Sequence, residues 1–145
     1  MTSSQGPSQG SRRQARERAL SLLYEASAKG LAAGAVLDDL PVAPSDFTTD
    51  LVRGVESALP ELDRLIESHA IDWALDRMPV VDLTLLRVAT YELCHRPDIP
   101  TAAVISEAVE LAAEYSTDES GRFVNGVLAA IAAEVRPTEE RPQNL

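Results

Sequence analysis

Apolar residues recur three or four positions apart along most of this chain, which is the spacing of one buried face of an α-helix. In the stretch from 82 to 96, for example, Leu86, Ala89 and Leu93 fall on one such face. No segment alternates apolar and polar residues between hairpin turns, and aromatic residues make up only 4% of the chain. Proline and glycine interrupt the pattern too often for a coiled coil. We therefore expect an all-α, single-domain bundle of about seven helices.

Caps and helix breakers give the expected boundaries. Ser11 suits the N-cap of a first helix that ends at Gly30, and a short helix over 31–40 stops at Pro41. Ser45 caps a third helix, and Pro60 suits the first turn of a separate fourth. A short segment at 73–79 precedes a largely buried helix over 82–96. The last two helices are expected after residue 100 and from residue 123, with a loop at 116–120 between them.

The two ends of the chain differ in composition from its centre. Residues 1–10 and 137–145 are rich in Ser, Gln, Pro and Glu, so we expect flexible tails around a folded domain at 11–136. No apolar run approaches the ~20 residues that span a bilayer, and the first residues lack the apolar segment of a signal peptide. Cys94 is the only cysteine, which excludes an internal disulfide framework. A cytoplasmic protein without membrane contact is expected.

The formal net charge is −10, from 13 Lys and Arg against 23 Asp and Glu. Taken as a sum, this charge disfavours nucleic acid as a partner. However, Arg12, Arg13, Arg16 and Arg18 lie in one stretch in which Glu17 is the only acid. A local excess of arginine is what contacts phosphate, so the position of the charge matters more than its sum.

Motifs for catalysis are missing from the sequence. It has no phosphate-binding loop, no dinucleotide-binding glycine pattern and no nucleophile elbow. The histidines, His69 and His95, have no second ligand at helical metal-site spacing. We therefore expect a protein that is not an enzyme and that uses no metal or cofactor.

Two segments favour binding instead. Arg12 and Arg16 lie one helical turn apart with Arg13 beside them, so they can contact successive phosphates; the alternative is a solvated helix start. The segment 116–126 brings polar groups, Arg122 and Phe123 to the start of a helix, where an aromatic ring can stack on an unpaired base. The alternative for this second segment is a capped helix whose Phe123 anchors the core.

Several ordered motifs together resemble the NusB family of bacterial transcription antitermination factors, over essentially residues 11–136. No single motif is decisive, but their combination at these spacings is highly specific. They are RRQARE at 12–17, Tyr24, LVRGV at 51–55, WALDRMPVVDLTLLRVATYEL at 73–93, DIP at 98–100, ISEAVELA at 105–112 and FVNGVL at 123–128.

The resemblance implies a helical bundle that binds the boxA element of nascent ribosomal RNA transcripts together with NusE, a small-subunit ribosomal protein. It also implies that the complex joins an antitermination assembly on RNA polymerase. Acidic positions that face NusE in the family correspond to Asp76 and Asp82. The residues implied for RNA binding are Arg12, Arg13, Arg16, Arg87, Glu119, Ser120, Arg122 and Phe123.

The sequence departs from the family pattern at positions that are commonly basic or polar. Leu83 and Ala113 replace basic residues, and Ser106 replaces an Asn. Loss of two phosphate contacts would flatten the salt dependence of RNA binding by about two units of slope. We therefore expect weak RNA binding by the chain alone and stronger binding with NusE, whose positive charge complements the acidic remainder of the surface.

Two alternatives to this function stay open at the level of sequence. The first is a NusB-like accessory domain of the kind found in ribosomal RNA cytosine methyltransferases, although the chain leaves no room for a cofactor-binding domain. The second is a self-associating structural module, since some family members form homodimers that could cover the RNA surface.

Overall fold

The computed structural model describes residues 9–137, and within this range the fold is entirely helical. This confirms the predicted all-α class. Of the predicted tails, residues 1–8 and 138–145 lie outside the described residues. The elements in chain order are α1 (Gln9–Lys29), α2 (Ala33–Asp38), α3 (Asp46–His69), the 3-10 helix η1 (Leu75–Arg77), α4 (Val80–His95), α5 (Thr101–Tyr115) and α6 (Asp118–Val135).

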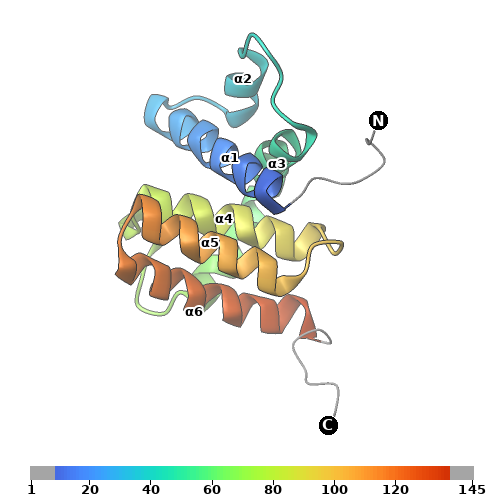
Figure 1. Cartoon of the computed structure of the whole chain (residues 1–145). Coiled ribbons are helices and arrows are strands. Elements are labelled where there is room, and N and C mark those ends of the chain that lie inside the picture. Colours follow the sequence, from blue (N-terminus) through green and yellow to red (C-terminus); the bar gives the residue numbers. More distant parts are fainter. Residues whose placement is uncertain (1–8, 138–145) are drawn as a thin grey trace.

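The helices pack in two groups around α4. In Figure 1, α4, α5 and α6 lie side by side, while α1 and α3 pack over them and α2 lies at the far end. Helix α4 contacts α1, α3, α5 and α6, and α2 bridges α1 and α3. Because α4 touches helices of both groups, it is the central helix of the bundle, as its wide apolar stripe predicts.

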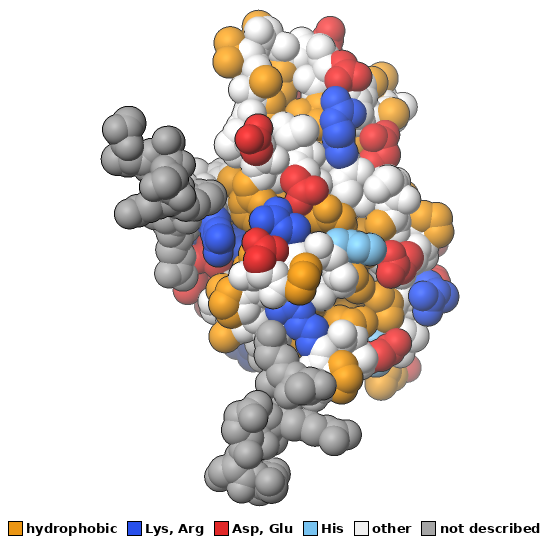
Figure 2. Space-filling view, turned by 90° about the vertical axis from the view of Figure 1, so that its right-hand side faces the viewer, with side chains coloured by type: hydrophobic (Ala, Val, Ile, Leu, Met, Phe, Trp, Pro, Cys, Tyr) orange, Lys and Arg blue, Asp and Glu red, His pale blue; other side chains and the backbone are white. Residues whose placement is uncertain are grey.

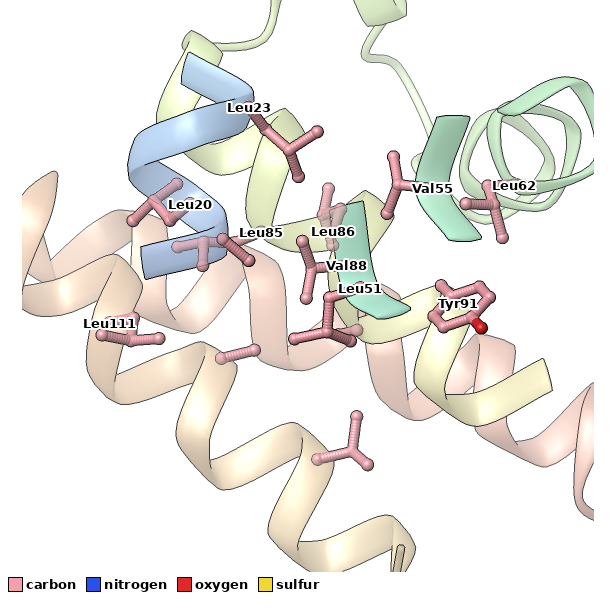
Figure 3. Close-up of a cluster of buried hydrophobic side chains, with 14 of the residues drawn as sticks. Leu20, Leu23, Leu51, Val55, Leu62, Leu85, Leu86, Val88, Tyr91 and Leu111 are labelled. Carbon is pink, nitrogen blue, oxygen red and sulfur yellow. The ribbon is translucent and has the colours of Figure 1, made fainter. Parts of the chain in front are cut away.

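The core is formed by side chains that converge from α1, α3, α4 and α5 (Figure 3). Leu51 of α3, Leu86 of α4 and Leu111 of α5 are completely buried. Burying one such leucine contributes about 1.5–3 kcal/mol. The helical spacing of these residues therefore accounts for most of the fold's stability.

The structure differs from the sequence prediction at Pro60, which does not begin a new helix. It lies inside α3, where the two helices expected on either side of it form one continuous element. Proline inside a helix costs about 3 kcal/mol because it removes a backbone donor and crowds the preceding turn. Leu51 and Val55 before Pro60 and Leu62 and Ile66 after it are all buried. Packing of this shared apolar face offsets the cost of the proline.

The start of α6 is also earlier than expected. Thr117 is the N-cap, and its Oγ1 accepts a hydrogen bond of 2.9 Å from the backbone N–H of Ser120. Asp118 and Glu119 occupy the first turn, where negative charge is favoured by the helix dipole. The predicted loop at 116–120 thus shortens to residues 116 and 117. As a result, Glu119 to Phe123 all lie on the opening turns of one helix.

Candidate nucleic-acid interface

The arginine-rich start of α1 packs against α5. Arg13 donates hydrogen bonds from Nη1 to Glu110 (2.6 Å) and from Nη2 to Glu114 (2.9 Å). Burial of the Arg13 guanidinium lowers its pKa, but the two hydrogen bonds outweigh this and leave the pKa above its ordinary value. Arg12 and Arg13 are both half-buried. Their guanidinium groups therefore lie at the surface, and that of Arg13 is held by α5.

Arg16 is placed differently from the prediction, because it is buried. Its side chain is 3% exposed, and it donates to both oxygens of Glu92, from Nε (2.9 Å) and from Nη2 (2.7 Å). Its Nη1 lies 3.5 Å from Glu107, and its guanidinium lies over the ring of Phe47. The same helical period that aligns Arg16 with Arg12 also brings it between the buried Ala15 and Ala19. Arg16 is thus not part of the exposed arginine surface.

The partner of Arg16 has an unusual environment for a carboxylate. Glu92 is 1% exposed in the middle of the bundle. Burial raises the pKa of Glu92, although the hydrogen bonds from Arg16 act in the opposite direction. A bidentate arginine is the partner that best satisfies both oxygens of a buried carboxylate.

A second group of candidate residues surrounds a cavity of about 410 Å³ at the start of α6. It brings together four residues implied for RNA binding and one implied for NusE, which come from separate parts of the chain. Its lining consists of Trp73, Met78, Pro79, Asp82, Ser116, Thr117, Glu119, Ser120, Arg122 and Phe123.

The aromatic wall of this cavity is formed by two rings. Those of Trp73 and Phe123 have centroids 5.9 Å apart at an angle of 58°. Phe123 is half-buried against the core, so it serves as a core anchor and also presents a face to the cavity. Trp73 is 49% exposed. In the sequence Trp73 belongs to a family motif without an assigned role, and its place as an isolated tryptophan in a proline-ended segment was the available signal.

The polar residues at the start of α6 divide into two kinds. Ser120 is buried, and its Oγ lies 2.9 Å from the Oγ of Ser116, so it helps close the helix cap. Glu119 and Arg122 are exposed at the rim of the cavity. Arg122 is therefore placed to contact a ligand directly, whereas Ser120 mainly positions the turn.

The last turn of α5 connects the arginine-rich start of α1 with this cavity. Glu114 holds Arg13, and the next residue, Tyr115, donates a hydrogen bond of 3.0 Å to Glu17 of α1. Ser116 follows directly and lines the cavity. The two predicted binding segments thus lie along one continuous face, although about a hundred residues separate them in the sequence.

Two further candidates are not gathered around the cavity. Arg87 donates two hydrogen bonds, of 2.8 and 2.9 Å, to Asp63 of α3. It lines a different cavity, between the end of α1, α2 and α3. Asp76 is exposed in η1. The structure therefore separates Arg87 from the other residues implied for RNA binding.

The remaining candidates for chemistry have structural partners. His69 lies 2.7 Å from Glu134, and His95 lies 3.0 Å from Glu61. Burial raises the pKa of the Cys94 thiol to about 11, so it is protonated at neutral pH. Among residues 9–137, no group of three or more His, Cys, Asp or Glu side chains is arranged to hold a metal ion. No helix in this range is long and apolar enough to cross a membrane.

Positive charge is not segregated on the face of the molecule shown in Figure 2. There Lys and Arg side chains lie between Asp and Glu side chains and apolar patches. With a net charge of −10 for the chain, such a mixed face gives little general attraction for phosphate. Any nucleic-acid contact must therefore come from local groups such as Arg12 and Arg122.

Comparison with known sequences identifies the family. The sequence model of the NusB family matches residues 13–133. A transcription antitermination protein NusB from Kineococcus radiotolerans is 46% identical over 125 residues, covering 83% of this chain and 92% of that protein. Another, from Streptomyces griseus, is 42% identical over 141 residues, covering 91% of this chain and 98% of that protein.

Solved structures agree with these relatives. NusB from T. maritima superposes with a TM-score of 0.79 at 35% identity, covering 88% of this chain and 94% of that one. A chain from the crystal structure of the antitermination factors NusB and NusE in complex with dsRNA gives a TM-score of 0.73 at 28% identity, covering 85% of this chain and 96% of that one. The class defined by these matches is a small all-helical transcription antitermination factor. The chain belongs to the NusB family.

Proposed function

We propose that this protein is a transcription antitermination factor that binds boxA RNA of nascent ribosomal RNA transcripts together with NusE. In this role it joins the antitermination complex on RNA polymerase in the cytoplasm, as a binding adaptor and not as an enzyme. Membership of the NusB family and the similarity to a chain solved with NusE and dsRNA support the proposal. The observation that carries it is the continuous face that joins the start of α1 to the cavity at the start of α6.

Each part of this face has a separate task in RNA binding. Arg12 and Arg13 contact phosphates at one end, and Arg122 contacts phosphate at the rim of the cavity. Phe123 offers a ring face for stacking on an unpaired base. Arg16 acts indirectly, because its ion pair with Glu92 fixes α1 against α4 and so positions Arg12 and Arg13.

The partner NusE supplies charge that this chain lacks. Leu83 and Ala113 stand where the family commonly has basic residues, and Arg13 is shared with two glutamates. These features weaken binding to RNA alone. A basic partner docked on acidic groups such as Asp76 restores the attraction and makes RNA binding cooperative.

The test is a salt titration of labelled boxA RNA binding, with and without purified NusE. We expect tighter binding with NusE. Replacing both Arg12 and Arg13 with Ala should reduce the salt slope by up to about two units, at about 0.9 per lost contact. Arg64→Ala removes the same type of charge from an exposed position on α3 and serves as the control. Binding that NusE does not tighten, or a double variant equal to this control, would contradict the proposal.

A further inference from the structure

Asp82 has an unexplained carboxylate oxygen. It lies in the first turn of α4, its residue is 3% exposed, and it lines the cavity at the start of α6. Its Oδ1 has no hydrogen-bond partner among the described residues. A buried carboxylate oxygen without a donor costs about 1–3 kcal/mol or more, so such an oxygen is typical of a site that a ligand completes.

The surroundings of Asp82 define which ligand would fit. Trp73 and Phe123 give the cavity an aromatic wall, and the hydroxyl groups of Ser116 and Thr117 lie nearby. A phosphate group is excluded next to Asp82 and Glu119, because like charges repel. A flat, uncharged ring with an N–H donor on its edge satisfies both the aromatic wall and the carboxylate.

We propose that this cavity receives one unpaired base of the bound RNA, and that Asp82 selects a base with an exocyclic amino group. Adenine, cytosine and guanine each present such a donor to a carboxylate, whereas uracil does not. Arg122, exposed at the rim, holds the phosphate of the same nucleotide. This inference rests on the proposed function and deepens it, since it moves Asp82 from the NusE contact implied by family resemblance to base recognition.

Trp73 makes the proposal directly measurable, because it is the only tryptophan in the sequence. A base entering the cavity must change the fluorescence of Trp73. The experiment titrates the full chain with NusE against boxA RNAs in which each amino-bearing base is replaced in turn by uracil. Binding is followed in parallel by the anisotropy of the labelled RNA and by Trp73 fluorescence.

We expect one position at which uracil reduces affinity about tenfold and abolishes the Trp73 signal. Asp82→Asn, which keeps the shape of the side chain, should lose this discrimination, because its amide also donates to a uracil carbonyl. Asp72→Asn is the matched control. It removes the same charge beside Trp73, and asparagine tolerates the positive φ of 70° at this position. The control should discriminate as the parent does.

The two readouts separate failure of this inference from failure of the proposed function. Tight RNA binding without a change in Trp73 fluorescence, or equal binding of every uracil-substituted RNA, would overturn the base site and leave the function intact. A fluorescence change caused by NusE alone and lost in Asp82→Asn would also overturn it, since a partner side chain would then fill the cavity. Absence of RNA binding even with NusE would refute the function itself.

Discussion

Arg16 and Glu92 form a buried bidentate ion pair that joins α1 to the central helix α4, with both side chains at most 3% exposed. Glu107 of α5 approaches the same guanidinium. Three helices therefore meet at one arginine that belongs to a run of otherwise surface-placed basic residues. The pair fixes where the start of α1 lies, and through it where Arg12 and Arg13 can meet RNA.

Replacing Arg16 with Ala should destabilise the protein by about 3–5 kcal/mol, because it leaves Glu92 as an uncompensated buried charge. Lys29→Ala breaks an exposed pair with Glu25 within α1 and should cost less than about 1 kcal/mol. Urea unfolding followed by circular dichroism compares the two variants. If both lose the same small amount, the buried pair does not hold α1 in place.

Gly54→Ala should destabilise the bundle by about 1–3 kcal/mol or more, because an added Cβ would collide with the ring of Tyr91. Gly126 of α6 has open space around it, so Gly126→Ala should stabilise the protein by about 0.5–1 kcal/mol through helix propensity. Thermal unfolding measures both changes. Opposite signs are expected, and a neutral Gly54→Ala would show that Tyr91 does not pack on this glycine.

The phenol of Tyr91 should titrate late. Burial and its hydrogen bond of 2.7 Å to Asp50 raise the pKa of Tyr91 to about 12. Since the folded pKa lies above the unfolded one, this stabilisation is complete below about pH 10 and is lost as the pH rises through 12. Absorbance of tyrosinate measures the titration. Tyr91→Phe should remove the late step, and Asp50→Asn should shift it to lower pH.

Releasing Arg13 from α5 should strengthen RNA binding. Glu110 and Glu114 occupy its guanidinium in the free chain, so phosphate must compete with them. Replacing both with Gln should raise boxA affinity several-fold, since each favourable 1.4 kcal/mol is a factor of ten. Glu67→Gln combined with Glu56→Gln removes the same charge from exposed positions on α3. An equal gain in this control would assign the effect to net charge rather than to Arg13.

The sequence by itself determined the helical class and most helix positions, because both follow from local rules. Spacing of apolar residues fixes which face of each helix is buried, and caps such as Ser45 fix where helices begin. The ordered motifs were also sufficient to indicate the NusB family, which the family match over residues 13–133 confirms. The prediction that failed locally, a helix start at Pro60, failed because packing of a continuous apolar face outweighed a local preference.

Only the tertiary structure decided which charged residues are available for binding. Arg12 and Arg16 look equivalent in sequence, yet Arg16 is buried because Glu92, 76 positions away, faces it across the bundle. The cavity that unites Trp73, Asp82 and Phe123 is likewise formed by segments distant in the chain. Helical periodicity tells which residues share a face, but not what that face meets. The partner of a charge depends on how helices pack, and packing is a property of the whole bundle.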